Sequence, residues 1–94
     1  MYIIRETFTA RPGKASSLAR LFKEIMADVV GLKFRVLSDY VGEFNTVVME
    51  TEVEDFAAFE RMMAEYGARR DVRDKMKGYT DMYVTGRREV YKVV

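Results

Sequence analysis

The chain has no cysteine, no histidine, no tryptophan and a single proline among its 94 residues. Without cysteine there are no disulfides, and without cysteine and histidine the usual ligands of a structural zinc site are missing. A domain of this size buries only about 60–65% of the surface that its unfolded chain exposes, so its stability is marginal. Association of two copies buries more apolar surface, and the 49% content of hydrophobic residues suits that route. We therefore expect one domain, residues 1–94, that needs no metal or cofactor and pairs with a second copy of itself.

The absence of histidine leaves acid–base chemistry to carboxylates, lysine or tyrosine. Sixteen basic and fifteen acidic residues give a formal charge of +1, which attracts neither nucleic acid nor anionic lipid. No apolar run approaches the roughly 18–20 residues of a membrane helix. Residues 1–4 are apolar, but Arg5 and Glu6 follow at once, so the apolar region is too short for a signal peptide. We expect a cytoplasmic protein that binds neither nucleic acid nor membrane.

Strand-like segments are recognised by β-branched and aromatic residues that alternate in polarity. They predict strands at residues 2–10, 33–41, 46–53 and 87–94. The turn Arg11-Pro12-Gly13 follows the first strand, and residues 42–45 supply a hairpin loop between the second and the third.

Apolar residues at helical spacing fill the gaps between these strands. A first amphipathic helix begins at Lys14 and is capped by Gly31; its apolar side is formed by Leu18, Leu21, Phe22, Ile25, Met26 and Val29. A second helix begins after residues 54–55, breaks at Gly67 and continues to Gly86. The order β-α-β-β-α-β predicts an α+β, ferredoxin-like fold: a four-stranded antiparallel sheet with the helices on one face.

Apolar side chains also occur on the sheet face that no helix would cover. The closing segment EVYKVV must point apolar residues in both directions, whereas a solvated face alternates cleanly into polar residues. Packing two such faces together in a twofold symmetric dimer removes the conflict. The expected interface residues are Ile3, Val48, Tyr91 and Val93.

Both ends of the sequence resemble the dimeric α/β-barrel superfamily. The opening YIIRETFTARPGK is similar to the family's first strand and "PGK" turn, and the closing GRREVYKVV resembles the "GxxEIYRVV" ending of NIPSNAP-like and antibiotic-biosynthesis-monooxygenase-like members. The resemblance implies a homodimer whose two sheets close into a barrel-like core, often with a cavity between each sheet and its helices. Members include cofactor-independent oxygenases, haem-degrading enzymes and small-molecule isomerases.

Haem degradation is the family activity that this sequence argues against. The resemblance implies that it relies on asparagine, tryptophan and histidine, but the chain has neither of the last two, and its one asparagine, Asn45, lies in the predicted hairpin loop. No catalytic residue is carried over from the family.

The strand carboxylates that could act as a catalytic base are Glu6, Asp39, Glu50 and Glu52. Glu6 is preferred, because it shares a strand face with Tyr2, Ile4 and Phe8 beside the helix-covered side. An ion pair with Arg35, with Arg5 of the partner subunit or with another cation at the sheet margin is the more frequent role of such a carboxylate. Methionine and aromatic side chains at core spacing can also line an adaptable pocket for a small, flat apolar ligand. The candidates are Phe22, Met49, Phe59, Met63, Tyr66 and Tyr83, although ordinary core packing explains the same spacing.

Two features argue against binding of nucleic acid. In ARRDVRDKMK, Asp71 and Asp74 interrupt the basic residues at i,i+4 spacing, which is typical of a solvated helix face. RNA-recognition domains share the order of elements but stack bases on aromatic residues of the first and third strands. Residues 46–53 contain no aromatic residue and include Glu50 and Glu52. An amino-acid-sensing module of the same topology stays open, though such modules are commonly attached to a larger enzyme.

Two functions therefore remain. The first is a cofactor-independent, monooxygenase-like enzyme acting on an apolar aromatic or quinone-like compound. The alternative is a non-catalytic homodimeric binding or interaction protein. A polar side chain in an enclosed cavity would favour the enzyme, and a filled cavity would favour the interaction protein.

Overall fold

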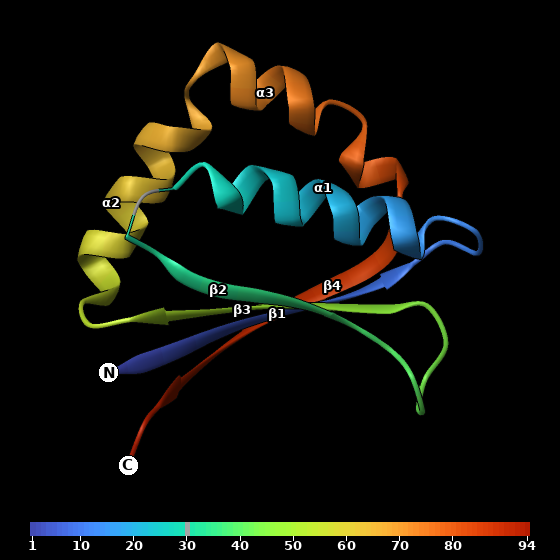
Figure 1. The fold of residues 1–94 in the computed structure, drawn as a ribbon, viewed down its shortest axis with the longest axis horizontal. Helices are drawn as coiled ribbons and strands as arrows, with labels where there is room; N and C mark the ends of the chain where they lie inside the picture. The colour runs from blue at the N-terminus through green and yellow to red at the C-terminus, as the bar shows by residue number, and fades with distance from the viewer. Residues whose placement is uncertain (30) are drawn as a thin grey trace.

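The computed structural model describes residues 1–29 and 31–94 and confirms the predicted order of elements (Figure 1). The strands are β1 (Tyr2–Ala10), β2 (Lys33–Ser38), β3 (Thr46–Val53) and β4 (Tyr83–Lys92). The helices are α1 (Ala15–Ala27), α2 (Phe56–Gly67) and α3 (Arg70–Met76), followed by the short 3-10 helix η1 (Tyr79–Asp81). The fold is of the ferredoxin-like α+β class.

The four strands form one antiparallel sheet in the order β2-β3-β1-β4. Helix α1 lies along one face of this sheet, and α3 arches over α1 on the side away from the sheet (Figure 1). Successive side chains of a strand point to opposite faces. Ile4 of β1 and Thr51 of β3, which are register partners, therefore point together toward the helices. No helix of the described residues lies over the other face (Figure 1), and we call it the open face.

The main core lies between α1 and the sheet. Leu18 of α1 and Val47 of β3 are both 0% exposed, and Phe22 and Met26 extend the same contact along the helix. A second cluster joins α1 to the helices above it through Ile25, Tyr66 and Val72. The helical spacing of apolar residues in α1 thus serves two layers, because one side of the helix meets the sheet and an adjoining side meets α2 and α3.

The end of the second helical segment differs from the prediction. Helix α3 ends at Met76, and Gly78 takes a left-handed conformation with φ +84° that ends the helical path. Strand β4 then begins at Tyr83, not at residue 87, and ends at Lys92. The prediction failed because Met76 and Tyr83 both pack on the core, so their spacing imitates one continuous helix.

Two other elements, β2 and α1, also end earlier than predicted. Strand β2 ends at Ser38, not at residue 41, because Asp39 accepts a hydrogen bond from the Thr46 amide at 3.0 Å and starts the loop early. Helix α1 ends at Ala27, so Gly31 is not its cap.

The start of α2 is as expected. Asp55 accepts hydrogen bonds from the amides of Ala57 at 3.0 Å and Ala58 at 3.3 Å, a cap that contributes about 1 kcal/mol. No helix within the described residues is long and apolar enough to cross a membrane.

Candidate functional site

The structure brings four of the six predicted ligand-lining residues together. Phe22 and Met49 are buried in the main core, and Met63 and Tyr83 pack against it. Phe59 lies apart, on a separate hollow of about 340 Å³ near the end of β3. Tyr66 lies in the second cluster. Their role in binding a ligand stays a prediction.

Tyr66 has a structural partner for its hydroxyl group. The hydroxyl donates a hydrogen bond of 2.7 Å to the carbonyl oxygen of Ile25, which ties α2 to α1. Burial raises the pKa of Tyr66 above its ordinary value, so the group remains a donor. A phenol held in this way is poorly placed to act on a ligand.

A cluster of four aromatic rings lies where α1, β1, η1 and β4 meet. The ring centroids of Phe8 and Phe22 are 4.9 Å apart, and those of Phe8 and Tyr83 are 5.0 Å apart. Tyr79 completes this aromatic cluster, 5.8 Å from Tyr83 and 6.4 Å from Phe22. Such separations are favourable for aromatic pairs. Of the four rings only Phe22 is fully buried, so the cluster reaches the surface.

Gly86 makes room for this aromatic cluster, a role that the sequence did not reveal. It is the β4 partner of Phe8, and a Cβ atom at this position would lie 2.8 Å from Cδ1 of the Phe8 ring. The ring lies over β4 because the strand has no side chain there. The prediction had placed Gly86 at the end of a helix, and that placement gave no reason to expect an aromatic ring against it.

Glu6 lies two residues before Phe8 on the same face of β1. Its carboxylate oxygen Oε2 is 3.2 Å from Nη2 of Arg88, its register partner on β4, and its side chain is 19% exposed. An ion pair is therefore present as expected, but its cation is Arg88; Arg35, the first cation expected, pairs with Glu50 instead. Burial raises the pKa of Tyr79, and the neighbouring Tyr83 and the charge of Glu6 raise it further. The site therefore combines a carboxylate with a phenol that keeps its proton.

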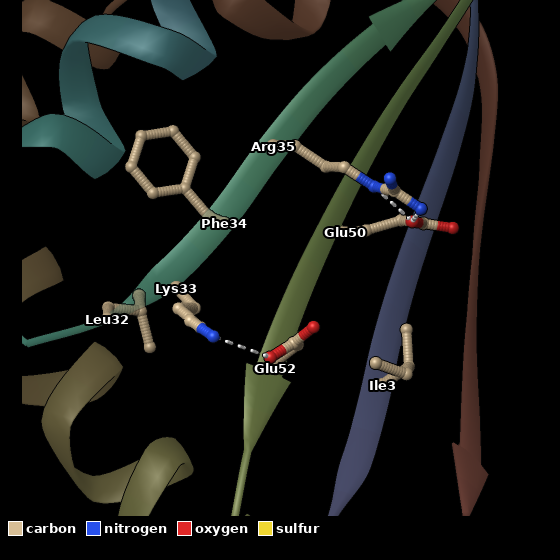
Figure 2. A pocket seen from close by; sticks show the side chains of 7 residues that line it. All are labelled: Ile3, Leu32, Lys33, Phe34, Arg35, Glu50 and Glu52. Atoms are coloured by element: carbon tan, nitrogen blue, oxygen red, sulfur yellow. Dashed lines mark hydrogen bonds and ion pairs between the residues drawn. The ribbon is translucent and has the colours of Figure 1, made fainter. Parts of the chain in front are cut away.

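The open face holds a second group of charged residues, shown in Figure 2. Glu50 is only 8% exposed, although it lies on the open face. Its Oε2 is 2.7 Å from Nε of Arg5, and its Oε1 is 2.6 Å from Nη2 of Arg35. Hydrogen bonds from Arg35 and Arg5 hold the pKa of Glu50 below its ordinary value against the opposing effect of burial. Sequence reasoning had treated Glu50 only as one of several strand carboxylates.

A hollow of about 520 Å³ adjoins this carboxylate at the β2 edge of the sheet. Its polar wall also contains Lys33 and Glu52, whose charged atoms are 3.9 Å apart (Figure 2). The hollow is lined by Ile3, Leu32, Lys33, Phe34, Arg35, Glu50 and Glu52. Its charges are already matched in pairs, so the hollow has no excess of one sign.

Three of the four predicted interface residues belong to the open face. Ile3 and Tyr91 are register partners there, and Val48 lies on the neighbouring strand. The Tyr91 hydroxyl donates to Glu89 at 2.6 Å, and the Arg5 guanidinium lies 5.3 Å from the centre of the Tyr91 ring. Val93 lies beyond the end of β4.

The comparisons with known proteins show the fold. No protein-family model and no curated protein matches the sequence. A NIPSNAP family protein of unknown function from Agrobacterium tumefaciens aligns with a TM-score of 0.83 and 13% identity, over 99% of this chain and 87% of that one. A NIPSNAP-like domain protein from Burkholderia xenovorans aligns with a TM-score of 0.83 and 20% identity, over 99% and 84%. A candidate antibiotic biosynthesis monooxygenase from Chloroflexus aurantiacus aligns with a TM-score of 0.77 and 13% identity, over 99% and 92%.

The resemblance seen at both ends of the sequence is thus confirmed at the level of the fold. The chain has the architecture shared by NIPSNAP-like and antibiotic-biosynthesis-monooxygenase-like proteins. At these identities the likeness carries the arrangement of helices and strands and no catalytic residue.

Proposed function

We propose that the protein is a homodimer that binds a small, flat apolar compound, aromatic or quinone-like, against the aromatic cluster beside Glu6. The observation that carries this proposal is the meeting of accessible rings with a carboxylate of low exposure. Phe8, Tyr79 and Tyr83 are partly buried rings from three elements, and Glu6 lies on the same side of the sheet. Apolar walls with few polar groups are typical of small-molecule sites.

The enzymatic form of the proposal gives Glu6 and Tyr79 different tasks. Glu6 accepts the proton of a phenol-type hydroxyl group on the ligand, and the Tyr79 hydroxyl donates a hydrogen bond to an oxygen of the same ligand. The raised pKa of Tyr79, caused first by burial, supports the donor role. An anionic, electron-rich ring is the form in which an aromatic compound reacts with dioxygen without a bound cofactor. This is the monooxygenase-like activity that we propose: a naphthol-type substrate and dioxygen give the quinone and water, so one oxygen atom enters the ring, the other leaves as water, and the substrate supplies all the electrons.

The dimer is supported by the composition of the open face. Leu37 and Tyr91 are exposed there, and Ile3 and Val48 add apolar surface between them. Packing this face against a second copy would remove that surface from water, as two-layer domains require.

A non-catalytic binding or interaction protein is the second candidate, and the packing of the core favours it. Leu18, Met26 and Val47 occupy the space between α1 and the sheet, and each is at most 2% exposed. The hollows of about 520 and 340 Å³ lie elsewhere, at the β2 edge and beside α2. On this interpretation the dimer itself is the functional form.

Thermal unfolding with 1-naphthol and 1,4-naphthoquinone tests the binding site. A ligand at 100 times its dissociation constant stabilises the folded state by about 2.7 kcal/mol, so the wild-type melting temperature should rise. Tyr83→Ala should abolish this rise, because it removes a wall of the aromatic cluster. Phe44→Ala, which removes an exposed ring from the hairpin loop, should leave the rise unchanged. No rise with either compound at high concentration would contradict the proposed site.

Oxygen consumption separates the two candidates. If the protein is an enzyme, wild type consumes dioxygen with 1-naphthol, and Glu6→Gln binds the compound but loses at least 100-fold in rate. Binding without oxygen consumption by the wild type would favour the non-catalytic binding protein.

A further inference from the structure

We propose that the open face binds a second copy of the chain in one orientation, with the twofold axis parallel to the strands and between β3 and β1. In this orientation Arg35 faces the partner's Glu89, and Glu50 faces the partner's Arg5. The inference rests on the proposed dimer and adds its register, which the fold alone does not determine.

Four charged residues form a single row across the open face. Arg35 is the register partner of Glu50, Glu50 of Arg5, and Arg5 of Glu89. The row crosses β2, β3, β1 and β4 in turn, and neighbouring strands lie about 4.8 Å apart. Its signs therefore read plus, minus, plus, minus from one edge of the sheet to the other. We call these four residues the charge row.

An alternating row of four charges complements itself only when it is reversed. A twofold axis parallel to the strands, at the middle of the sheet, reverses the charge row and sets every charge opposite one of the other sign. An axis that runs along the charge row sets Arg35 opposite the partner's Arg35 and Glu50 opposite the partner's Glu50. Facing charges of opposite sign set the register of an interface, and facing like charges exclude it.

An axis across the strands at other heights is also disfavoured. If the axis crosses the strands halfway between the charge row and the row that contains Lys33 and Glu52, Arg35 would face the partner's Lys33, and Glu50 would face the partner's Glu52. If the axis lies halfway between the charge row and the row that contains Leu37 and Val48, Arg35 and Glu50 would face these two apolar residues of the partner subunit. Burying charges against like or apolar side chains carries a large desolvation cost.

The rows beside the charge row are compatible with the proposed axis. Lys33 would face the partner's Tyr91, which places a cation against an aromatic ring. Val48 would face the partner's Thr7, so no like charges meet. Glu52 would face the partner's Ile3, and Arg87 would face the partner's Leu37. These two charge–apolar contacts are offset by the fully matched charge row, whereas the alternative axes leave Arg35 and Glu50 themselves facing like or apolar side chains. Sheets packed in this way keep their strand directions within about 30°, as in aligned sandwiches.

The outer members of the charge row are free to reach a partner. The Arg35 side chain is 70% exposed and that of Glu89 is 37% exposed. The Glu89 carboxylate already accepts from Tyr91 and Arg87 of its own chain, and a carboxylate has further lone pairs. Glu50 is already largely removed from water within one chain, which lowers the cost of covering it.

Charge reversal in two separate chains tests this register. Arg35→Glu alone and Glu89→Arg alone each create two like-charge contacts per dimer, so each dissociation constant should rise at least tenfold. Mixed in equal amounts, the two variants should form a heterodimer with the wild-type affinity, because both contacts are again of opposite sign. Sedimentation velocity measures association, and native mass spectrometry identifies the heterodimer by its mass. Lys23→Glu, which changes the charge equally on exposed α1, should leave dimerisation unchanged.

The outcomes distinguish the register from the dimer. If the wild type is monomeric at high concentration, the proposed dimer itself is wrong. If the wild type dimerises but the mixture associates no better than the single variants, the register is wrong and the dimer stands. Preferential pairing of Arg35→Glu with the wild type would favour the axis along the charge row.

Neutral substitutions provide a second test if a charge reversal prevents folding. Arg35→Gln and Glu89→Gln should each weaken the dimer, and the double variant should be weaker by less than the product of the two effects. Independent, multiplying effects would overturn the proposed contact.

Discussion

The two faces of the sheet deal with their apolar residues in different ways. On the helix-covered face, Leu18, Val47 and their neighbours form a core that is complete within one chain. On the open face, apolar side chains such as Ile3 and Leu37 alternate with a row of matched charges. The same four strands therefore support one face whose stability depends on packing and another whose exposed charges are matched within the chain. The first face therefore stabilises the fold, and the second is the face through which we propose that the chain associates.

The largest effect should come from the helix-covered face. Leu18→Ala should lower the free energy of unfolding by about 2–5 kcal/mol, because it leaves a cavity in the main core. Leu37→Ala, at an exposed position of the open face, should cost less than about 1 kcal/mol in a dilute, monomeric sample. Urea denaturation at low protein concentration measures both. Equal losses would remove the contrast between the two faces.

The next effect concerns association through the open face. Tyr91→Lys should raise the dissociation constant of the dimer about 100-fold, because it replaces a ring beside Arg5 with a second cation, which would also face the partner's Lys33. Val93→Asp should act in the same direction. Analytical ultracentrifugation checks both variants, and a stable dimer of folded Tyr91→Lys would place the interface elsewhere.

Gly86 offers a test of the aromatic cluster. Gly86→Ala places a methyl group 2.8 Å from the Phe8 ring, and relieving this overlap should cost about 1–3 kcal/mol of stability. Gly67→Ala is the matched control, since its Cβ would meet no atom within 4 Å and its backbone is helical; it should stabilise by about 0.5–1 kcal/mol. Thermal unfolding of both variants measures the difference. Equal effects would mean that Phe8 does not need the space over Gly86.

The smallest effect should be the dependence of stability on pH through Glu50. Its pKa is lowered in the folded state by Arg35 and Arg5. The ion pairs therefore stabilise the fold above the unfolded-state pKa of Glu, and this contribution is lost as the pH falls through the folded-state pKa. Glu50→Gln should cost about 1–2 kcal/mol at neutral pH, less than a fully buried pair, because both arginines contact water.

The pH profile provides the control. The difference in unfolding free energy between wild type and Glu50→Gln should shrink progressively as the pH falls below about 5. Glu54→Gln, at a side chain that is 86% exposed, should show almost no difference at any pH. A constant difference for Glu50→Gln across this range would show that its ionisation does not contribute.

Several elements could be predicted because local chemistry decides them. The bounds of β1 and β3 match the prediction, since alternating polarity over eight or nine residues leaves little choice of face. Asp55 caps α2 as expected, because its carboxylate bonds amides only two and three residues away. Glu6 and Phe8 were also assigned correctly to the helix-covered side.

The candidate site was only partly predictable. Glu6 and Tyr83 were proposed, but the pairing of Glu6 with Arg88 joins residues 82 positions apart and depends on the register of β1 with β4. Tyr79 and Tyr83 were expected on a helix, and they contribute to the aromatic cluster through η1 and the start of β4. The left-handed turn at Gly78 ends the helical path before Tyr79. The spacing of apolar residues does not show where such a turn occurs.

The amino-acid sequence by itself determined the order of the elements, the two faces of each strand and the presence of apolar side chains on both faces of the sheet. These follow from interactions between residues close together in the chain. Only the tertiary structure decided which charges stand side by side and where Gly86 admits the Phe8 ring. Register and close approach arise when distant strands pair, and many registers satisfy the same local pattern until packing selects one.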